Sequence, residues 1–234
     1  ELYMKTHGGR SFLHGHMFGD HVHEYLAPCI YEGEGEMLGM AFFKSLVKDH
    51  GTKYFEPIGK ALAAAGIKQP NPLNAAHGWA LKDALVPYGK WLAGQYLMPK
   101  RYTAVPAMAP ELAAHCEYAI EALQRSPLEI SGTMRKHQLK LADRQCRMSE
   151  LSARIQKLII ILCTSIHASQ QESELVQSAA DVVCQDLRRE LSGRRPSDRY
   201  FRSATKLGQS IVEGGVSDFI DEVPDEILMP YDSE

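Results

Sequence analysis

Apolar residues recur at helical spacing along most of the chain, and this periodicity restricts the fold more than any other feature. The strongest run has spacings of 3, 4, 3, 4 and 4 residues, through Met148, Leu151, Ile155, Leu158, Leu162 and Ile166. Such spacing places one face of a helix against other helices. No stretch sustains the period-two alternation of a half-buried strand. The sequence therefore predicts an all-α, bundle-like fold.

Segments rich in proline and glycine divide this helical pattern. Residues 66–74 and 99–110 are too proline-rich to carry a helix through. We expect four parts: helices over residues 1–66, a linker with an amphipathic helix over 67–106, a further helical domain over 107–216, and an acidic tail over 217–234. The expected helices are Glu34–His50, Tyr54–Ala65, Glu111–Arg125 with a break at Ser126-Pro127, the long helix through Ile166, Glu172–Leu191 and Asp198–Glu213.

Composition narrows the class of protein. The chain has 26 Lys and Arg against 29 Asp and Glu, a mild net charge of −3 that argues against a nucleic-acid coat protein. Its five cysteines are widely spaced without a Cys-x-x-Cys pair, which indicates reduced thiols in an intracellular, reducing compartment, either cytoplasmic or mitochondrial. The longest purely apolar run, Leu158 to Cys163, is too short to predict a transmembrane span. The opening residues begin in mid-pattern, so we expect a segment of a longer chain.

Histidines crowd the beginning of the chain. Two His-x-His pairs, at positions 14 and 16 and at positions 21 and 23, lie beside Asp20 and Glu24. Imidazole and carboxylate groups are common zinc ligands, but residues two apart point to opposite sides of a strand and lie far apart on a helix. We therefore expect surface or helix-capping histidines and no metal site.

Three carboxylates precede an apolar helix in the segment Ile30 to Leu38. A helix N-terminus favours the charges of Glu34 and Glu36 through its macrodipole, which is a purely structural explanation. Glu32 differs because it follows an uncharged run and precedes Gly33, where a ligand can approach the backbone closely. A carboxylate in apolar surroundings has a raised pKa and can accept a proton from a carbon acid. Glu32 is thus either a helix-start residue or a catalytic base.

The order of two short motifs resembles a known family. His7-Gly8-Gly9-Arg10-Ser11-Phe12 begins a little over twenty residues before the start of Ile30-Tyr31-Glu32-Gly33, and an apolar helix follows. This arrangement is similar to the C-terminal end of the flavin-dependent acyl-CoA dehydrogenases. Further stretches resemble the additional C-terminal domain of the very-long-chain branch: Ala109-Pro110-Glu111-Leu112, Ala119 to Leu123, Tyr200-Phe201-Arg202 and Val212 to Gly215.

This resemblance implies specific roles for the motif residues. Glu32 would be the catalytic base that removes the α-proton of an acyl thioester, giving a trans-2-enoyl-CoA in fatty acid β-oxidation. Tyr31 and Gly33 would contact the acyl-CoA substrate. The cofactor FAD would be contacted by residues of both motifs, namely His7, Gly8, Gly9, Glu34 and Glu36.

The same resemblance implies the setting in which these residues act. The family builds its active site from further domains, so we expect the present chain alone to retain no FAD and to be inactive. A homo-oligomer and electron-transfer flavoprotein as electron acceptor are implied as partners. The competing interpretation is a non-enzymatic helical module for interaction or membrane docking.

Two further segments allow two readings each. Leu73 to Met98 interleaves aromatic and apolar residues, including Trp79 and Trp91, with lysines; this suits either a helix in a membrane interface, as the very-long-chain branch implies, or a core helix interrupted at Pro87 and Gly89.

Six arginines gather near the C-terminus, and they suit either a phosphate ligand or a solvated face. The cluster is Arg188, Arg189, Arg194, Arg195, Arg199 and Arg202. We expect no nucleic-acid binding, since stacking aromatics are not interleaved.

Overall fold

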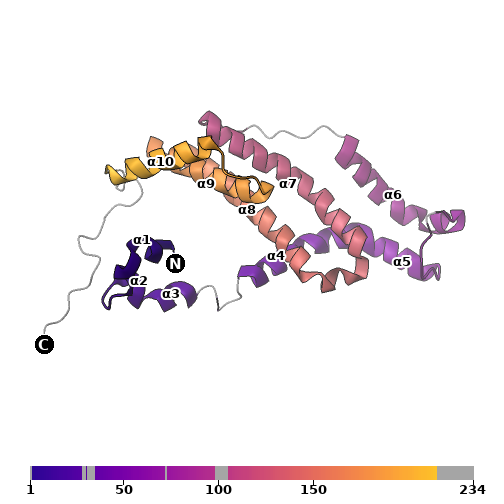
Figure 1. Ribbon diagram of the computed structural model, residues 1–234. Helices are drawn as coiled ribbons and strands as arrows, with labels where there is room; N and C mark the ends of the chain where they lie inside the picture. The colour runs from indigo at the N-terminus through magenta and orange to yellow at the C-terminus, as the bar shows by residue number, and fades with distance from the viewer. Residues whose placement is uncertain (1, 28–29, 31–34, 72, 98–104, 215–234) are drawn as a thin grey trace.

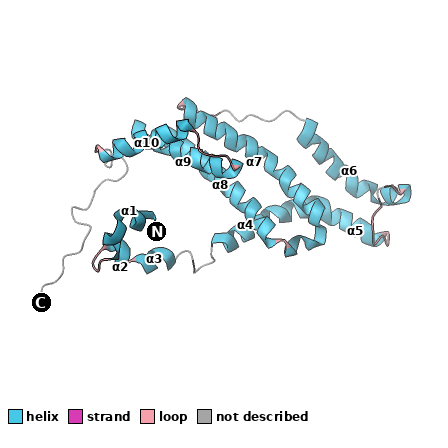
Figure 2. Ribbon diagram, viewed as in Figure 1, coloured by secondary structure: helices cyan, strands magenta, loops and turns pink. Residues whose placement is uncertain are grey.

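The computed structural model describes residues 2–27, 30, 35–71, 73–97 and 105–214, and these residues form an all-α structure without strands. The elements run from α1 to α10 with short 3₁₀ and π segments between them (Figures 1 and 2). Their bounds are α1 Leu2–His7, η1 Gly8–Phe12, α2 Met17–Asp20, α3 Val22–Leu26, α4 Gly35–His50, η3 Gly51–Phe55, α5 Glu56–Ala64, α6 Ala75–Leu97, α7 Pro110–His137, η4 Gln138–Asp143, α8 Gln145–Ser169, α9 Glu174–Ser192 and α10 Asp198–Val212.

Helices α7 and α8 form the long antiparallel pair on which the other helices pack. Element η4 turns the chain between them, and Figure 1 shows the pair running through the centre of the molecule. Helix α9 packs on α8 and α7, and α10 packs on α9 at one end of the pair. Helix α4 packs on α8 towards the other end. The pair therefore has two ends with different neighbours.

The largest apolar core lies where α4 meets α7 and α8. Phe43 is fully buried there, and the cluster joins Met40 and Phe43 of α4 to side chains of the long pair and η4, namely Ile130, Met134, Leu141, Met148, Leu151 and Ile155. The Ser152 hydroxyl donates a hydrogen bond of 2.7 Å to the Gly39 carbonyl oxygen. A Cβ atom at Gly39 would lie 3.2 Å from the Ser152 Oγ, so glycine permits this close approach of α4 and α8.

The buried face of α8 follows the sequence periodicity along its first half and then shifts. Met148, Leu151, Ile155 and Leu158 are buried, as their spacing predicts. Further along, Ile161, Ser165 and Ala168 are buried, whereas Leu162 and Ile166 are only half-buried. The shift follows from packing on α9, whose small residues Ala180 and Cys184 accept this other stripe.

Two prolines that we expected to interrupt helices lie inside continuous ones. Helix α7 passes through Pro127, so the predicted break at Ser126-Pro127 is wrong. Helix α6 likewise passes through Pro87 and Gly89. Proline removes one backbone donor and costs about 3 kcal/mol in a helix interior. Packing on both sides offsets that cost, since Leu123 borders the large core and Ile130 belongs to it.

An aromatic cluster joins the end of α4 to α6 through the π-helix η3. The cluster is His50, Tyr54, Phe55, Tyr88 and Trp91. The rings of His50 and Trp91 lie 4.6 Å apart between centroids, and those of Tyr88 and Trp91 are stacked at 5.7 Å. Tyr88 also shares a buried hydrogen bond of 2.8 Å with Ser131 of α7. This half of α6 is thereby held against the bundle.

Helix α8 is long and apolar enough, by length and composition, to cross a membrane; it is the one such helix in the described part of the chain. Core helices of soluble proteins pass the same test. One face of α8 is packed against α4, α7 and α9, so its apolar character is explained by its place in the bundle.

Candidate functional site

The expected catalytic segment falls largely outside the described residues. Tyr31, Glu32, Gly33 and Glu34 are among the residues that the structure leaves undescribed. Glu36 belongs to the first turn of α4, which begins at Gly35, directly after the motif. The roles expected for these five residues stay predictions.

The first motif covers the end of α1 and the short 3₁₀ helix η1, which turns the chain and exposes Gly8, Gly9 and Arg10. Gly8 has a positive φ of 62°, and a Cβ atom added at Gly8 or Gly9 would meet nothing within 4 Å. The Ser11 hydroxyl donates to the Gly8 carbonyl oxygen at 2.7 Å, which fixes the turn. His7 packs edge-on against His16 and Phe18, with ring centroids 5.2 and 5.1 Å away. The turn therefore offers an open backbone beside an anchored imidazole.

The other N-terminal histidines take local roles. His16 is buried, and its Nδ1 accepts a hydrogen bond of 3.2 Å from the Phe18 N–H, capping α2. Nδ1 of His14 lies 3.3 Å from Asp20, and Nδ1 of His21 lies 2.8 Å from Glu24. Among the described residues, no group of three His, Cys, Asp or Glu side chains is arranged to hold a metal ion. The capping role expected for these histidines is confirmed at His16.

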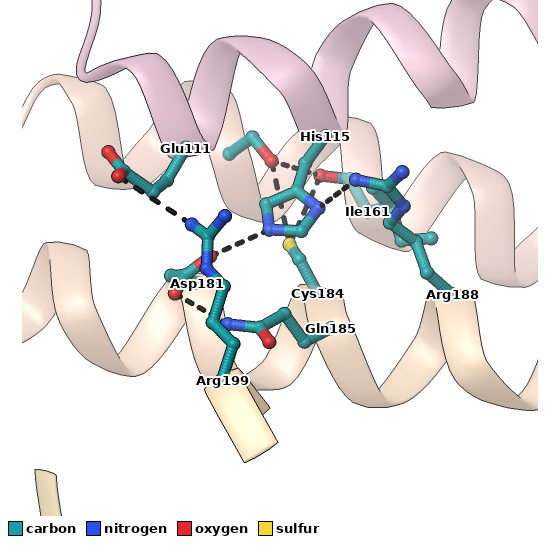
Figure 3. A network of polar contacts seen from close by, with 9 residues as sticks. Glu111, His115, Ile161, Asp181, Cys184, Gln185, Arg188 and Arg199 are labelled. Carbon is teal, nitrogen blue, oxygen red and sulfur yellow. Dashed lines mark hydrogen bonds and ion pairs between the residues drawn. The ribbon is translucent and has the colours of Figure 1, made fainter. Parts of the chain in front are cut away.

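A buried polar network lies at the far end of the bundle, where α7 meets α9 (Figure 3). His115 of α7 is 3% exposed. Its Nε2 lies 2.9 Å from Asp181 Oδ1, and its Nδ1 lies 3.0 Å from a terminal nitrogen of Arg188. The imidazole thus bridges a carboxylate and a guanidinium that both belong to α9.

The two neighbours of His115 fix its tautomer. A guanidinium can only donate hydrogen bonds, so Nδ1 of His115 must accept from Arg188. The proton then resides on Nε2, which donates to Asp181. Since both ring nitrogens are engaged, the imidazole is not free to act as a general base. Its arrangement is suited to orienting Arg188, whose guanidinium also lies over the Tyr118 ring at 4.4 Å from the centroid.

Asp181 is held in its charged form at the centre of this network. Burial opposes ionisation, but hydrogen bonds from His115 and Gln185 and the nearby charge of Arg199 outweigh it, so the pKa of Asp181 is lowered. Arg199 in turn lies 3.6 Å from Glu111 (Figure 3). The carboxylate is therefore committed to neighbours within the protein.

Two thiols lie beneath the network. Cys116 and Cys184 are fully buried, and Cys184 Sγ lies 3.5 Å from the Ser165 hydroxyl. Burial raises the pKa of both thiols. A protonated, inaccessible thiol is a poor nucleophile, so these cysteines serve packing.

Beside the network, residues of α7, α9 and α10 line a cavity of about 690 Å³ that is open to solvent, and we name it the arginine pocket. Five guanidinium groups line it, from Arg188, Arg189, Arg194, Arg195 and Arg199. The Tyr200 hydroxyl donates to Asp186 at 3.0 Å, and this hydrogen bond raises the pKa of Tyr200. Five of the six arginines grouped from the sequence line this cavity, whereas Arg202 does not. The sequence did not indicate the cavity or the roles of His115 and Asp181, because those residues lie 66 positions apart.

Comparisons of the chain with family models, with curated proteins and with solved structures gave no match.

Proposed function

We propose that this chain is the C-terminal part of an FAD-dependent acyl-CoA dehydrogenase, acting on long-chain acyl-CoA in fatty acid β-oxidation. The observation that carries the proposal is the order and spacing of His7-Gly8-Gly9 and Tyr31-Glu32-Gly33 ahead of an apolar helix. The start of α4 at Gly35 supports it, since the helix begins directly after the second motif.

The exposed glycine turn fits the expected cofactor contact. The backbone of Gly8 and Gly9 is open to a large ligand, and Ser11 holds the turn in shape. In the complete enzyme His7, Gly8, Gly9, Glu34 and Glu36 would hold FAD, which supplies a hydride acceptor when it is bound. The first three residues of this set lie together on one anchored turn.

The remaining chemistry belongs to the second motif. Glu32 would take the α-proton of the thioester on a carboxylate oxygen, which requires a base fixed beside the substrate. Gly33 lacks a side chain and would let the thioester lie against the backbone. Tyr31 would line the same acyl-CoA site. A second copy of the chain and electron-transfer flavoprotein remain the partners expected from the resemblance.

The direct test replaces Glu32 by Gln in the complete protein that contains this sequence. Long-chain acyl-CoA is added without oxygen, and bleaching of the flavin absorbance is followed. We expect substrate binding to persist while the reduction rate falls by about 10² or more, the usual contribution of a general base. Glu56→Gln on the exposed start of α5 is the matched control and should reduce at the original rate.

Two results would contradict the proposal: a complete protein that binds no flavin, or flavin reduction at full rate in the Glu32→Gln variant. The isolated 234-residue chain is a separate check, because we expect it to be colourless and inactive on acyl-CoA.

A second candidate function, docking to a membrane surface, is favoured by the exposed side chains of α6. Trp79 is 73% exposed and carries the Lys82 ammonium over its ring at 3.7 Å, an arrangement suited to a lipid interface. Tyr96 and Leu97 are exposed at the far end of the helix. Trp91, by contrast, is packed in the aromatic cluster and is not part of this surface.

Vesicle co-sedimentation tests this second function. Trp79→Ser should lower the lipid-bound fraction, whereas Phe201→Ser, which removes an exposed aromatic side chain from α10, should leave it unchanged. Equal bound fractions for all three proteins would contradict membrane docking through α6.

A further inference from the structure

We propose that the arginine pocket binds a small molecule that carries two or more phosphate groups. This inference is independent of the dehydrogenase proposal, because the pocket is built by α7, α9 and α10 and contains none of the residues expected to act on acyl-CoA. The pocket's volume of about 690 Å³ lies within the usual range for small-molecule sites.

The charge lining the pocket is strongly positive. Five arginines face it, whereas Glu111 and Asp181 are the carboxylates of its wall. Asp181 is committed to His115 and Gln185, and Glu111 lies 3.6 Å from Arg199. Asp186, just outside the wall, accepts hydrogen bonds from Arg189 and Tyr200. A surplus of guanidinium groups therefore remains for an anion.

Two of these arginines are available to a ligand. Arg194 and Arg195 lie on the short connection between α9 and α10, where Gly193 adopts a left-handed conformation with φ of 65° and turns the chain. Both side chains are exposed, and within the described part of the chain neither has a hydrogen-bond or ion-pair partner.

The floor of the pocket is organised before any ligand arrives. His115 orients Arg188 through a hydrogen bond of 3.0 Å, and Tyr118 supports the same guanidinium from its ring face. A fixed guanidinium loses little conformational entropy when it binds phosphate, and its planar fork can make two parallel hydrogen bonds to phosphate oxygens. Arginine rather than lysine is used at each cationic position of the wall.

The distribution of these arginines over three segments favours a ligand with more than one anionic group. Arg188 and Arg189 come from α9, Arg194 and Arg195 from the connection, and Arg199 from α10. Guanidinium groups on three segments approach a ligand from several directions, and a single phosphate group is small relative to a cavity of about 690 Å³. A diphosphate or bisphosphate ligand can engage several at once, and such chemistry occurs in nucleotides and in phosphorylated lipid headgroups.

The test titrates the complete chain with inorganic pyrophosphate and with inorganic phosphate by calorimetry. We expect saturable pyrophosphate binding that is tighter than phosphate binding and that weakens as salt is added. The double variant Arg194→Ala, Arg195→Ala should weaken pyrophosphate binding on the order of tenfold or more. Both substituted side chains are exposed, so we expect the variant to fold normally, and an unfolding curve checks this.

A matched double variant separates a built site from general charge attraction. Lys136→Ala, Arg144→Ala removes two exposed cations from a different pocket, near η4, and changes the net charge equally. It should leave the affinity unchanged. Equal weakening by both double variants, or no saturable binding of pyrophosphate to the original chain, would overturn the proposal.

The source of the ligand is identified in the same assay. Adenosine 3′,5′-bisphosphate stands for a nucleotide, and inositol 1,4-bisphosphate stands for a lipid headgroup. Tighter binding of either one than of pyrophosphate supports the site and names its source. Binding to anionic vesicles with no binding of any soluble bisphosphate or diphosphate would overturn the small-molecule site.

Discussion

Two histidines mark opposite regions of the bundle, and the chain accommodates them in different ways. His50, at the end of α4, is surrounded by the rings of Tyr54, Phe55, Tyr88 and Trp91, and its buried Nε2 has no hydrogen-bond partner among the described residues. His115, between α7 and α9, has both ring nitrogens engaged.

This difference shows how surroundings decide what an imidazole contributes. Burial is the main cause that lowers the pKa of His50, with a smaller contribution from the Lys53 charge. The neutral form of the ring is therefore favoured, and it packs like an aromatic hydrocarbon side chain. His115 instead connects two charged side chains and fixes the geometry of a pocket wall. One region is stabilised by ring packing, and the other is specified by directional hydrogen bonds.

The largest expected effect comes from a substitution that disrupts the aromatic cluster. Trp91→Ala removes a side chain that contacts His50, Tyr54 and Tyr88, and it should lower the free energy of unfolding by about 3 kcal/mol, the range for large aromatic truncations. Trp79→Ala, on the same helix but exposed, should change it by less than about 0.5 kcal/mol. Chemical denaturation measures both, and equal losses would refute the packing difference.

The next largest effect comes from a substitution that disrupts the hydrogen-bond network around His115. Asp181→Ala leaves the His115 Nε2–H and the Gln185 amide without their acceptor, and should destabilise by about 2 kcal/mol. Because the pKa of Asp181 is lowered by folding, its contribution is present above the unfolded pKa and lost as pH falls through the folded value. Asp83→Ala on exposed α6 is the control. If acid sensitivity were the same in both variants, the network would contribute nothing.

A smaller effect sharpens the comparison by testing the hydrogen bond between Tyr88 and Ser131 at the edge of the aromatic region. Tyr88→Phe removes the hydroxyl that lies 2.8 Å from Ser131 Oγ and keeps the ring. The expected loss is about 1 kcal/mol, because Ser131 is left buried without this partner. The double variant Tyr88→Phe, Ser131→Ala should recover part of it. Additive losses would contradict direct coupling of the two hydroxyls.

The smallest expected effect is the pH dependence contributed by His50. Folding lowers its pKa, so the unfolded chain binds the proton better and stability falls as pH drops below about 6.5. The His50 ring is only half-buried, so solvent partly screens its charge and the loss should stay below about 1 kcal/mol. His50→Phe should remove that dependence, whereas His167→Gln on exposed α8 surface should retain it. Unfolding curves at several pH values decide the matter.

Helix positions could be predicted from local signals, while helix continuity could not. Ser173 and Ser197 cap α9 and α10 with their hydroxyls, and Gly193 ends α9, as such residues usually do. Pro127 gives an equally clear local signal to stop, but the packing of Leu123 and Ile130 overrides it. The packing partners lie on α4 and α8, which are distant in sequence, so the residues near Pro127 do not reveal them.

The candidate pocket was accessible to sequence reasoning only in part. The arginines lie close together in the chain, so their clustering is visible. His115 lies on α7 and Asp181 on α9, with η4 and α8 between them in the chain, and nothing near either residue indicates that they meet. The buried face of α8 shifts from Leu162 to Ile161 for the same reason, because packing against α9, which is distant in sequence, determines which residues are buried.

Prolines inside α6 and α7 have a consequence for the order of folding. Each removes a backbone donor where a helix must propagate, so a peptide covering either helix alone should be mostly unstructured in water. We expect each helix to become continuous across its proline only when it docks, α7 onto α8 and α6 onto the aromatic cluster. We therefore expect α7, the longest helix of the described residues, to form late, as a product of assembly and not as a preformed rod.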